Sequence, residues 1–164
     1  MTNNRTDLLI VGAGPVGLFT AFYAGMRNLS VRLVDSLPEI GGQPKALYPE
    51  KNIFDIPAYP KITGHELSQV LQAQLDRFSA TTDIHLNEKV LNIQKNDQDF
   101  TIQTSESTYT AGAVIIAAGN GSFKPRKIAI SGLSDYEGQH ISYHVSDFIK
   151  YTGKEVAVLG GGDS

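Results

Sequence analysis

The sequence predicts an α/β fold in which a mostly parallel sheet is flanked by helices, and three observations support this class. Residues 8–11 form a short, continuously apolar run that leads into a glycine-rich turn, as expected for a parallel strand buried on both faces. A stretch of helical length and a second apolar run, residues 31–35, follow this turn. An apolar run ending in glycine returns at residues 114–119 and again at 154–162. Together these signals indicate parallel strands connected by helices.

The first turn carries Gly12, Gly14 and Gly17 in the spacing G-x-G-x-x-G, where the strand must pass into a helix. We expect Gly12 to permit the tight turn, Gly14 to let backbone approach a pyrophosphate, and Gly17 to let the helix pack closely on the strand. The pyrophosphate would lie at the helix N-terminus, where unpaired N–H groups and the helix dipole favour negative charge. The motif therefore predicts a Rossmann-like dinucleotide site, with a plain βαβ packing turn as the alternative.

A helix is predicted to follow this turn. Pro15 suits its first position, and Asn28 can adopt the left-handed conformation that ends a helix. We expect most of this helix to be buried, because apolar residues dominate it. Its predicted buried stripe consists of Val16, Phe19, Thr20 and Tyr23, broadened by Leu18, Ala21 and Phe22.

Asp35 ends the second strand. It stands at about the spacing of 20 residues from the glycines at which a carboxylate reaches the hydroxyls of an adenosine ribose. A carboxylate there would repel the 2′-phosphate of NADPH. The first site is therefore predicted to hold FAD or NAD.

Residues 37–44 are predicted to be a loop in which Gly41 and Gly42 let backbone pass close to the rest of the cofactor. Gln43 offers its amide to polar ring or ribityl atoms, and an ordinary surface turn is the alternative. Residues 46–60 are rich in proline, which predicts a rigid extended segment that lines the site. Within it, Tyr48 either stacks on a flat heterocycle or is a core aromatic, and the residues alone leave both open.

Thr63 and Glu66 have the spacing of a capping box, which predicts a helix from Thr63 to Ser79. A small antiparallel meander is then expected before the parallel sheet resumes. Its predicted strands are residues 84–86, 89–95, 100–104 and 108–111. The run 114–119 is predicted to be a further buried strand, where small residues and Gly119 allow a cofactor to lie across the strand ends.

Composition excludes several kinds of function. With 164 residues, 41% of them hydrophobic, the chain can bury a real core, and its length allows one domain or slightly more. A net charge of −3 without basic runs argues against a nucleic-acid or membrane-surface partner. Glycines, Pro15 and Asp7 interrupt the N-terminal apolar stretch, so neither a signal peptide nor a membrane span is expected and a cytoplasmic location is predicted.

The chain contains no cysteine, which excludes disulfides, thiolate metal sites and dithiol redox chemistry within these residues. His140 and His144 have no other metal-ligating residues in company, so no metal site is predicted. Residues 123–126 change the character of the chain and are expected to mark a crossover. Residues 154–159 are predicted to be a strand that runs into a second glycine-rich turn, at which a second dinucleotide fold begins and is cut short.

With both glycine turns in view, the chain resembles flavoprotein reductases with two dinucleotide-binding folds. It is most similar to the thioredoxin-reductase-like type of ferredoxin–NADP reductase, and the resemblance covers the whole chain. The chain is therefore expected to be an N-terminal fragment of such a protein. The motifs that carry the resemblance are residues 12–17, Asp35, 41–43, 46–51, 117–119 and 160–164. The resemblance implies FAD in the first fold, NADPH in the second, and a homodimer that passes electrons between NADPH and ferredoxin or flavodoxin through the flavin. It assigns residues 1–122 to an FAD-binding domain and 123–164 to the crossover and the truncated start of an NADPH-binding domain.

The same resemblance implies roles for single residues. Gly14 would back the pyrophosphate, Asp35 would bind the adenosine ribose in place of the more usual glutamate, and Gln43 would contact the flavin half. Tyr48 would stack on the isoalloxazine ring. The predicted cofactor-binding residues in full are Gly12, Gly14, Pro15, Gly17, Asp35, Gly42, Gln43, Tyr48, Val90 through its backbone at the adenine, Gly119, and Phe123 at the flavin. Catalytic side chains are not expected, because the flavin carries the chemistry.

One departure bears on the electron acceptor. Thioredoxin reductases carry C-x-x-C shortly before their second glycine turn, and residues 143–146 fill that place here without a thiol. This favours a one-electron acceptor such as ferredoxin or flavodoxin. The alternatives are a thioredoxin-reductase-like flavoenzyme with another acceptor, a flavin monooxygenase, for which the second glycine turn falls early, and a non-enzymatic flavin-binding redox module. The chain itself is expected to bind FAD and not to turn over NADPH.

Overall fold

The computed structural model describes residues 5–121, 127, 129–143, 145 and 148–160. The chain divides into two compact units, Met1–Lys124 and Pro125–Ser164. In the first unit the regular elements are β1 (Arg5–Val11), α1 (Pro15–Gly25), β2 (Val31–Val34), α2 (Gly42–Leu47), β3 (Asn52–Ile53), β4 (Ile62–Thr63), α3 (Gly64–Leu75), the 3-10 turn η1 (Asp76–Phe78), β5 (Thr82–His85), β6 (Val90–Lys95), β7 (Phe100–Thr104) and β8 (Thr108–Ile116).

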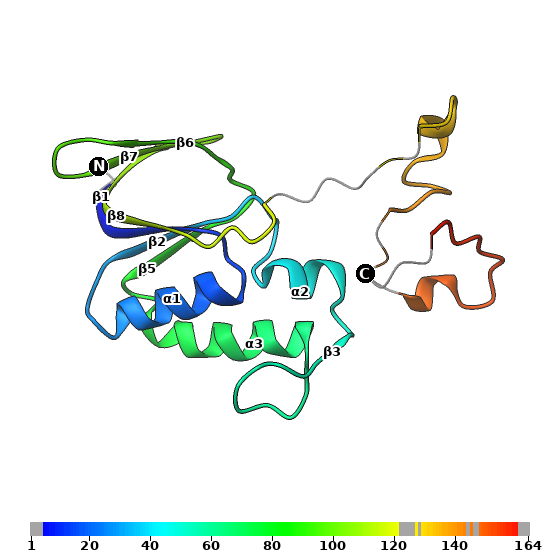
Figure 1. Ribbon diagram of the computed structural model, residues 1–164, viewed down its shortest axis with the longest axis horizontal. Coiled ribbons are helices and arrows are strands. Elements are labelled where there is room, and N and C mark those ends of the chain that lie inside the picture. The colour runs from blue at the N-terminus through cyan, green and yellow to red at the C-terminus, as the bar shows by residue number, and fades with distance from the viewer. Residues whose placement is uncertain (1–4, 122–126, 128, 144, 146–147, 161–164) are drawn as a thin grey trace. The chain divides into compact units, whose positions relative to one another are not determined.

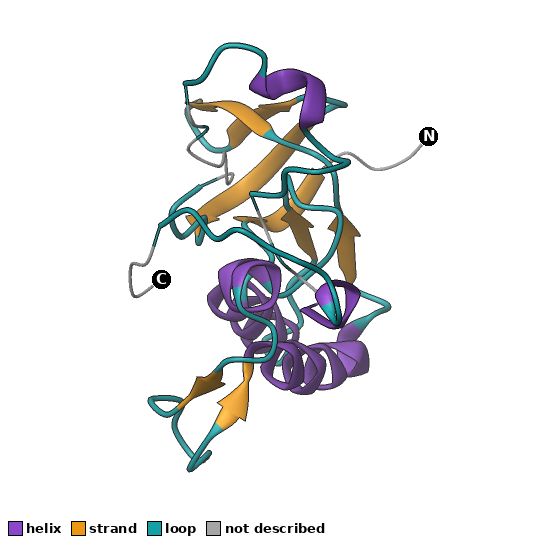
Figure 2. Cartoon of the chain, turned by 90° about the vertical axis from the view of Figure 1, so that its right-hand side faces the viewer, coloured by secondary structure: helices purple, strands orange, loops and turns teal. Residues whose placement is uncertain are grey.

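A six-stranded sheet in the order β5-β2-β1-β8-β7-β6 is the centre of this unit (Figure 1). The four strands β5, β2, β1 and β8 run parallel, while β7 and β6 are antiparallel to their neighbours. Helices gather on one face of the sheet, and the small β3–β4 pair lies beyond them (Figure 2). The predicted α/β class with a mostly parallel sheet is therefore confirmed.

The meander differs from the prediction in two ways. Its expected first strand is β5, which instead pairs parallel with β2 at the edge of the sheet. The expected separate strands at 108–111 and 114–119 are one strand, β8, which ends at Ile116. Residues 108–111 of β8 pair with β7, and residues 110–116 pair with β1. A Cβ on Gly112 would lie 3.1 Å from Asp7 O of β1, and pairing with β1 continues past this glycine.

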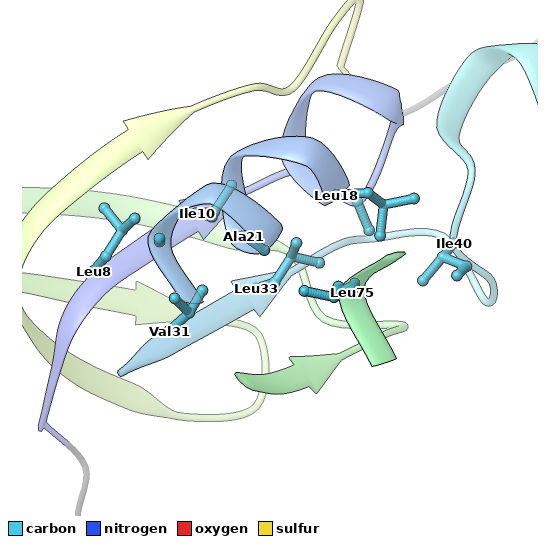
Figure 3. Packing of buried hydrophobic residues seen from close by; sticks show 10 residues of the cluster. Leu8, Ile10, Leu18, Ala21, Val31, Leu33, Ile40 and Leu75 are labelled. Carbon is cyan, nitrogen blue, oxygen red and sulfur yellow. The ribbon is translucent and has the colours of Figure 1, made fainter. Parts of the chain in front are cut away.

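Two apolar clusters hold the sheet in place. Alternate residues of β1 supply both: Leu8 and Ile10 face the helices, whereas Leu9 faces the meander. The cluster under the helices contains Leu8, Ile10, Leu18, Ala21, Val31, Leu33, Ile40 and Leu75, among others (Figure 3). Fully burying a leucine or isoleucine stabilises a fold by about 1.5–3 kcal/mol, so β1 contributes heavily to this unit.

The predicted buried face of α1 is confirmed at Leu18 and Ala21 but wrong at Val16, Phe19 and Tyr23. Val16 is 67% exposed, and Phe19 and Tyr23 are exposed beside it. The buried residues are Gly17, Leu18, Ala21, Ala24 and Gly25. A Cβ on Gly17 would lie 1.8 Å from Gly12 O, and one on Gly25 would lie 2.4 Å from the Phe78 ring. Because α1 is apolar on all sides, the pattern could not identify its buried face, and small residues decided it by allowing close approach.

Residues 42–47 correct a second prediction, because they form the short helix α2 where a loop and an extended segment were expected. Gly41 begins it at φ +115°, and Pro44 falls within its first turn, where proline is tolerated. The helix predicted from Thr63 is present. Its capping box is complete, with Glu66 N–H donating to Thr63 Oγ1 at 3.2 Å and Thr63 N–H donating to Glu66 Oε2 at 2.9 Å. It ends at Leu75, and η1 continues to Phe78.

In the second unit the regular elements of the described residues are two 3-10 turns, η2 (Leu133–Tyr136) and η3 (Phe148–Tyr151). The strand predicted at 154–159 is wrong, since these residues have no regular secondary structure. A strand requires a neighbouring strand to which it can hydrogen-bond, and the described part of this unit contains no such strand. The expected crossover at 123–126 and the glycines at 161–162 lie outside the described residues. Within the described chain, every helix is too short or too polar to cross a membrane.

Candidate functional site

The turn from β1 to α1 brings the ends of three strands together. Gly12 N–H donates to Val34 O at 2.8 Å, and Ala117 N–H donates to Val11 O at 2.8 Å. Gly12 has φ +109°, and a Cβ there would lie 2.4 Å from Ala117 O. Only glycine fits this position, because both the backbone angle and the neighbouring strand exclude a side chain.

Gly14 and Gly17 differ in what surrounds them. Gly17 packs against the turn itself, with no room for a Cβ beside Gly12 O. A Cβ on Gly14 would lie 3.7 Å from Gly42 Cα, which is an ordinary van der Waals contact. Protein packing therefore requires glycine at 17 but tolerates alanine at 14. Gly14 is the N-cap of α1, with extended backbone, and lines an open cleft.

Asp35 closes the turn with both carboxylate oxygens. Oδ2 accepts from Ala13 N–H at 2.6 Å, and Oδ1 accepts from Leu37 N–H at 2.8 Å. A carboxylate oxygen can accept more than one hydrogen bond, so acceptor capacity remains for a ligand hydroxyl. Asp35 therefore holds the glycine turn and faces the same cleft.

A cleft of about 470 Å³ lies across the ends of β1, β2 and β8. All of the predicted cofactor-binding residues line it except Gly17, which is buried behind the turn, and Phe123, which lies outside the described residues. The cleft is also lined by Ala117 and Ala118, as expected from the small residues before Gly119, and by Leu37 and Pro44 of the predicted cofactor loop. Its remaining lining residues were not predicted to contact a cofactor: Val11, Val16, Val34, Ser36, Glu88, Lys89 and Gly121. Val11 and Val34 could have been found from their position at the ends of predicted strands, whereas no local sequence pattern marks Glu88.

The second glycine pair packs on the first turn. Gly41 N–H donates to Ala13 O at 2.8 Å. Gly42 has φ +59°, and a Cβ there would lie 2.7 Å from Gly14 Cα. These glycines were expected to let backbone pass close to a cofactor. Their tightest contacts are instead with protein, and they bring α2 against the glycine turn.

Gln43, Tyr48 and Gly119 also line the cleft. Gln43 Oε1 lies 3.9 Å from where a Gly119 Cβ would be. Tyr48 is 37% exposed, and Lys51 Nζ lies 5.9 Å from the centre of its ring. Tyr48 is therefore not a core aromatic, and its stacking on a heterocycle stays a prediction.

The chemistry of the cleft is that of a binding site. It offers a helix N-terminus, a carboxylate and an amide around a mostly apolar wall. Among the residues that the structure describes, no three His, Asp or Glu side chains gather in a way that could hold a metal ion. Groups of this kind suit a ligand with a phosphate, a sugar and a flat apolar ring.

The glycine turn at a helix N-terminus, the carboxylate after the second strand and the cleft across the strand ends define a nucleotide-binding α/β protein. A family model described as pyridine nucleotide-disulphide oxidoreductase matches residues 9–164. The chain belongs to this family.

Its relatives are reductases. It is 53% identical over 158 residues to the ferredoxin–NADP reductase of Streptococcus pneumoniae serotype 2 strain D39, covering 96% of this chain and 48% of that protein. It is 47% identical over 164 residues to the ferredoxin–NADP reductase of Streptococcus equi subsp. zooepidemicus, covering 100% and 50%. The chain therefore spans about half the length of the curated relatives it matches.

Among solved structures, the thioredoxin reductase of Streptococcus pyogenes MGAS5005 matches with a TM-score of 0.64 and 30% identity. The match covers 82% of this chain and 41% of that one. These comparisons confirm the resemblance to ferredoxin–NADP reductases of the thioredoxin-reductase-like type. They also confirm the predicted flavoprotein fold class.

Proposed function

We propose that residues 1–122 bind FAD and that the full-length protein is an FAD-dependent oxidoreductase that passes electrons between NADPH and ferredoxin or flavodoxin. The observation that carries the proposal is the cleft across the ends of β1, β2 and β8, because residues predicted from distant parts of the sequence line it together. The names of the relatives support the reaction. The remaining residues, 123–164, would begin the NADPH-binding domain.

The chain's own groups would hold FAD from end to end. The first turn of α1 has N–H groups without helical acceptors, which suit the pyrophosphate. Asp35 would accept from the adenosine ribose, and the Val90 backbone would meet the adenine. Gln43 and Tyr48 would contact the flavin half. When bound, the flavin accepts a hydride and releases electrons singly, so no catalytic acid or base is required of the protein.

The finer assignments rest on the resemblance and on composition. A chain with no cysteine has no dithiol to relay electrons within these residues, which favours ferredoxin or flavodoxin over thioredoxin. The net charge of −3 supports the absence of nucleic-acid and membrane-surface partners. A cytoplasmic location and a homodimer of the full-length protein complete the proposal, and light scattering of the full-length protein tests the dimer.

The first test is the visible spectrum of the purified chain with and without added FAD, because bound flavin absorbs where protein does not. We expect one FAD per chain, and a Gly14→Ala variant that folds but loses at least tenfold in affinity, since its methyl group would occupy the place of the pyrophosphate. A colourless protein that refuses FAD would overturn the proposal. The chain alone is expected not to oxidise NADPH, and measurable NADPH oxidation would contradict that expectation.

A thioredoxin-reductase-like flavoenzyme with another acceptor is the second candidate. The similarity to a solved thioredoxin reductase favours it. Reduction of ferredoxin, flavodoxin and thioredoxin by the full-length protein, each measured with NADPH as donor, separates the two. Flavin that binds but is never reduced by NADPH in the full-length protein would instead support a redox-sensing module.

A further inference from the structure

The loop between β5 and β6 holds the end of β2 through its backbone. Glu88 N–H donates to Asp35 O at 2.9 Å, and Asn87 N–H donates to Leu37 O at 2.9 Å. In return, Asp35 N–H donates to His85 O at 2.9 Å. The position of Asp35, the predicted ribose ligand, therefore depends on this loop.

The loop is in turn anchored by a buried carboxylate. Glu88 is only 4% exposed. Its Oε1 accepts from the Thr104 hydroxyl of β7, and its Oε2 accepts from the Tyr109 hydroxyl of β8 at 3.2 Å. His85 Nδ1 lies 3.3 Å from the same Oε2. A buried carboxylate is costly unless its oxygens are satisfied, so these partners determine where Glu88 can sit.

The partners of Glu88 are themselves held by charge. His85 Nε2 lies 2.8 Å from Asp83 Oδ2, which pairs with Arg32 at 3.0 Å. The Arg32 guanidinium stacks 4.3 Å from the centre of the Tyr109 ring. Burial acts to raise the pKa of Asp83, but hydrogen bonds from His85 and Arg32 outweigh it and hold that pKa below its usual value. Asp83 therefore stays ionised, and β2, β5 and β8 are linked around Glu88.

We propose that Glu88 is a positioning residue for the adenosine end of the cleft. Its side chain is fastened to the meander, its N–H holds Asp35, and Val90 lies two residues further on. Both Glu88 and Val90 line the cleft. Loss of the Glu88 carboxylate releases the loop, so that Asp35 and the Val90 backbone no longer face the adenosine together. This inference rests on the proposed binding of FAD.

The test compares the dissociation constants of FAD and of ADP, which reports on the adenosine half alone, for the wild-type chain and for Glu88→Ala. We expect Glu88→Ala to raise the dissociation constants of both ligands by the same factor of about ten, which corresponds to about 1.4 kcal/mol of binding free energy. Glu88→Gln keeps an acceptor of the same shape and should recover to within about threefold of wild type. Glu106→Ala removes a carboxylate from an exposed residue of the nearby β7–β8 turn, and should leave both constants unchanged.

Circular dichroism without ligand shows whether each variant is folded. Should Glu88→Ala not fold, Tyr109→Phe removes one hydrogen bond to the carboxylate at nearly constant volume, and it should weaken ADP about threefold. If Glu88→Ala folds and binds ADP as tightly as wild type, the proposal is overturned. If Glu88→Ala does not fold, the same result for Tyr109→Phe overturns it. A loss confined to FAD, or a Glu88→Gln as weak as Glu88→Ala, also overturns it. Failure of the wild-type chain to bind FAD would instead contradict the proposed function. That result is measured on the wild type alone, so it is distinct from the outcomes for the variants.

Discussion

At the scale of single residues, one glycine motif contains three different physical requirements. Gly12 needs its positive φ and the space beside Ala117, Gly17 needs close contact with the turn, and Gly14 is free of both. The sequence pattern predicts all three positions equally, but only the surroundings show which of them the fold requires. The proposed pyrophosphate would account for glycine at 14, where protein packing does not require it.

Gly17→Ala is expected to destabilise the protein. Its methyl group would lie 1.8 Å from Gly12 O, so α1 must move away from the turn. We expect a loss of about 1–3 kcal/mol in the free energy of unfolding, as for other overpacked sites. Urea denaturation followed by circular dichroism measures it, with Gly14→Ala as the matched control that should unfold near the wild-type midpoint. Equal midpoints for Gly17→Ala and wild type would contradict the packing argument.

Asp35→Ala is expected to affect stability as well as binding. It leaves the N–H groups of Ala13 and Leu37 without their acceptor. Losing hydrogen bonds to a charged group costs about 1.5–3 kcal/mol. Asp35→Asn keeps one acceptor oxygen and should lose less. Urea denaturation without FAD ranks the two variants, and an Asp35→Ala chain as stable as wild type would show that the carboxylate serves the ligand alone.

At the scale of elements, α1 and α3 show which local signals can be trusted. The capping box of α3 was predicted from Thr63 and Glu66 because its hydrogen bonds join residues only three apart. The whole buried face of α1 was not predicted, because it depends on packing against residues distant along the chain, such as Phe78 beside Gly25. Residue type at a helix end is a local constraint, whereas the face that packs is a tertiary one.

The capping box predicts a dependence of stability on pH. Hydrogen bonds from the backbone N–H and then the hydroxyl of Thr63 hold the pKa of Glu66 below its usual value. A group whose pKa is lower in the folded state stabilises the fold above its unfolded pKa, and this contribution is lost as pH falls through the folded value. Between about pH 5 and pH 3, wild type should therefore lose more stability than Glu66→Gln. Melting temperatures at several pH values measure the difference, and parallel curves would contradict it.

At the scale of the whole molecule, FAD should stabilise the first unit by mass action. A ligand at a hundred times its dissociation constant adds about 2.7 kcal/mol to the free energy of unfolding. For a unit of this size we expect the melting temperature to rise by about 10 °C. Differential scanning calorimetry measures the rise, and Gly14→Ala with tenfold weaker binding should show about half of it at the same FAD concentration. An unchanged melting temperature in the wild type, at an FAD concentration that saturates its spectrum, would contradict the prediction.

The sequence alone determined the α/β class, the glycine turn, Asp35 after the second strand and the start of α3. Each of these depends on residues close together in the chain, where backbone angle and hydrogen bonding restrict the choice of residue. Tertiary structure alone decided that β5 joins the parallel sheet, that α1 buries its small residues, and that Glu88 lies buried beside the cleft. These outcomes depend on which distant segments pair and pack, and that choice is made by the free energy of the assembled core rather than by any local pattern.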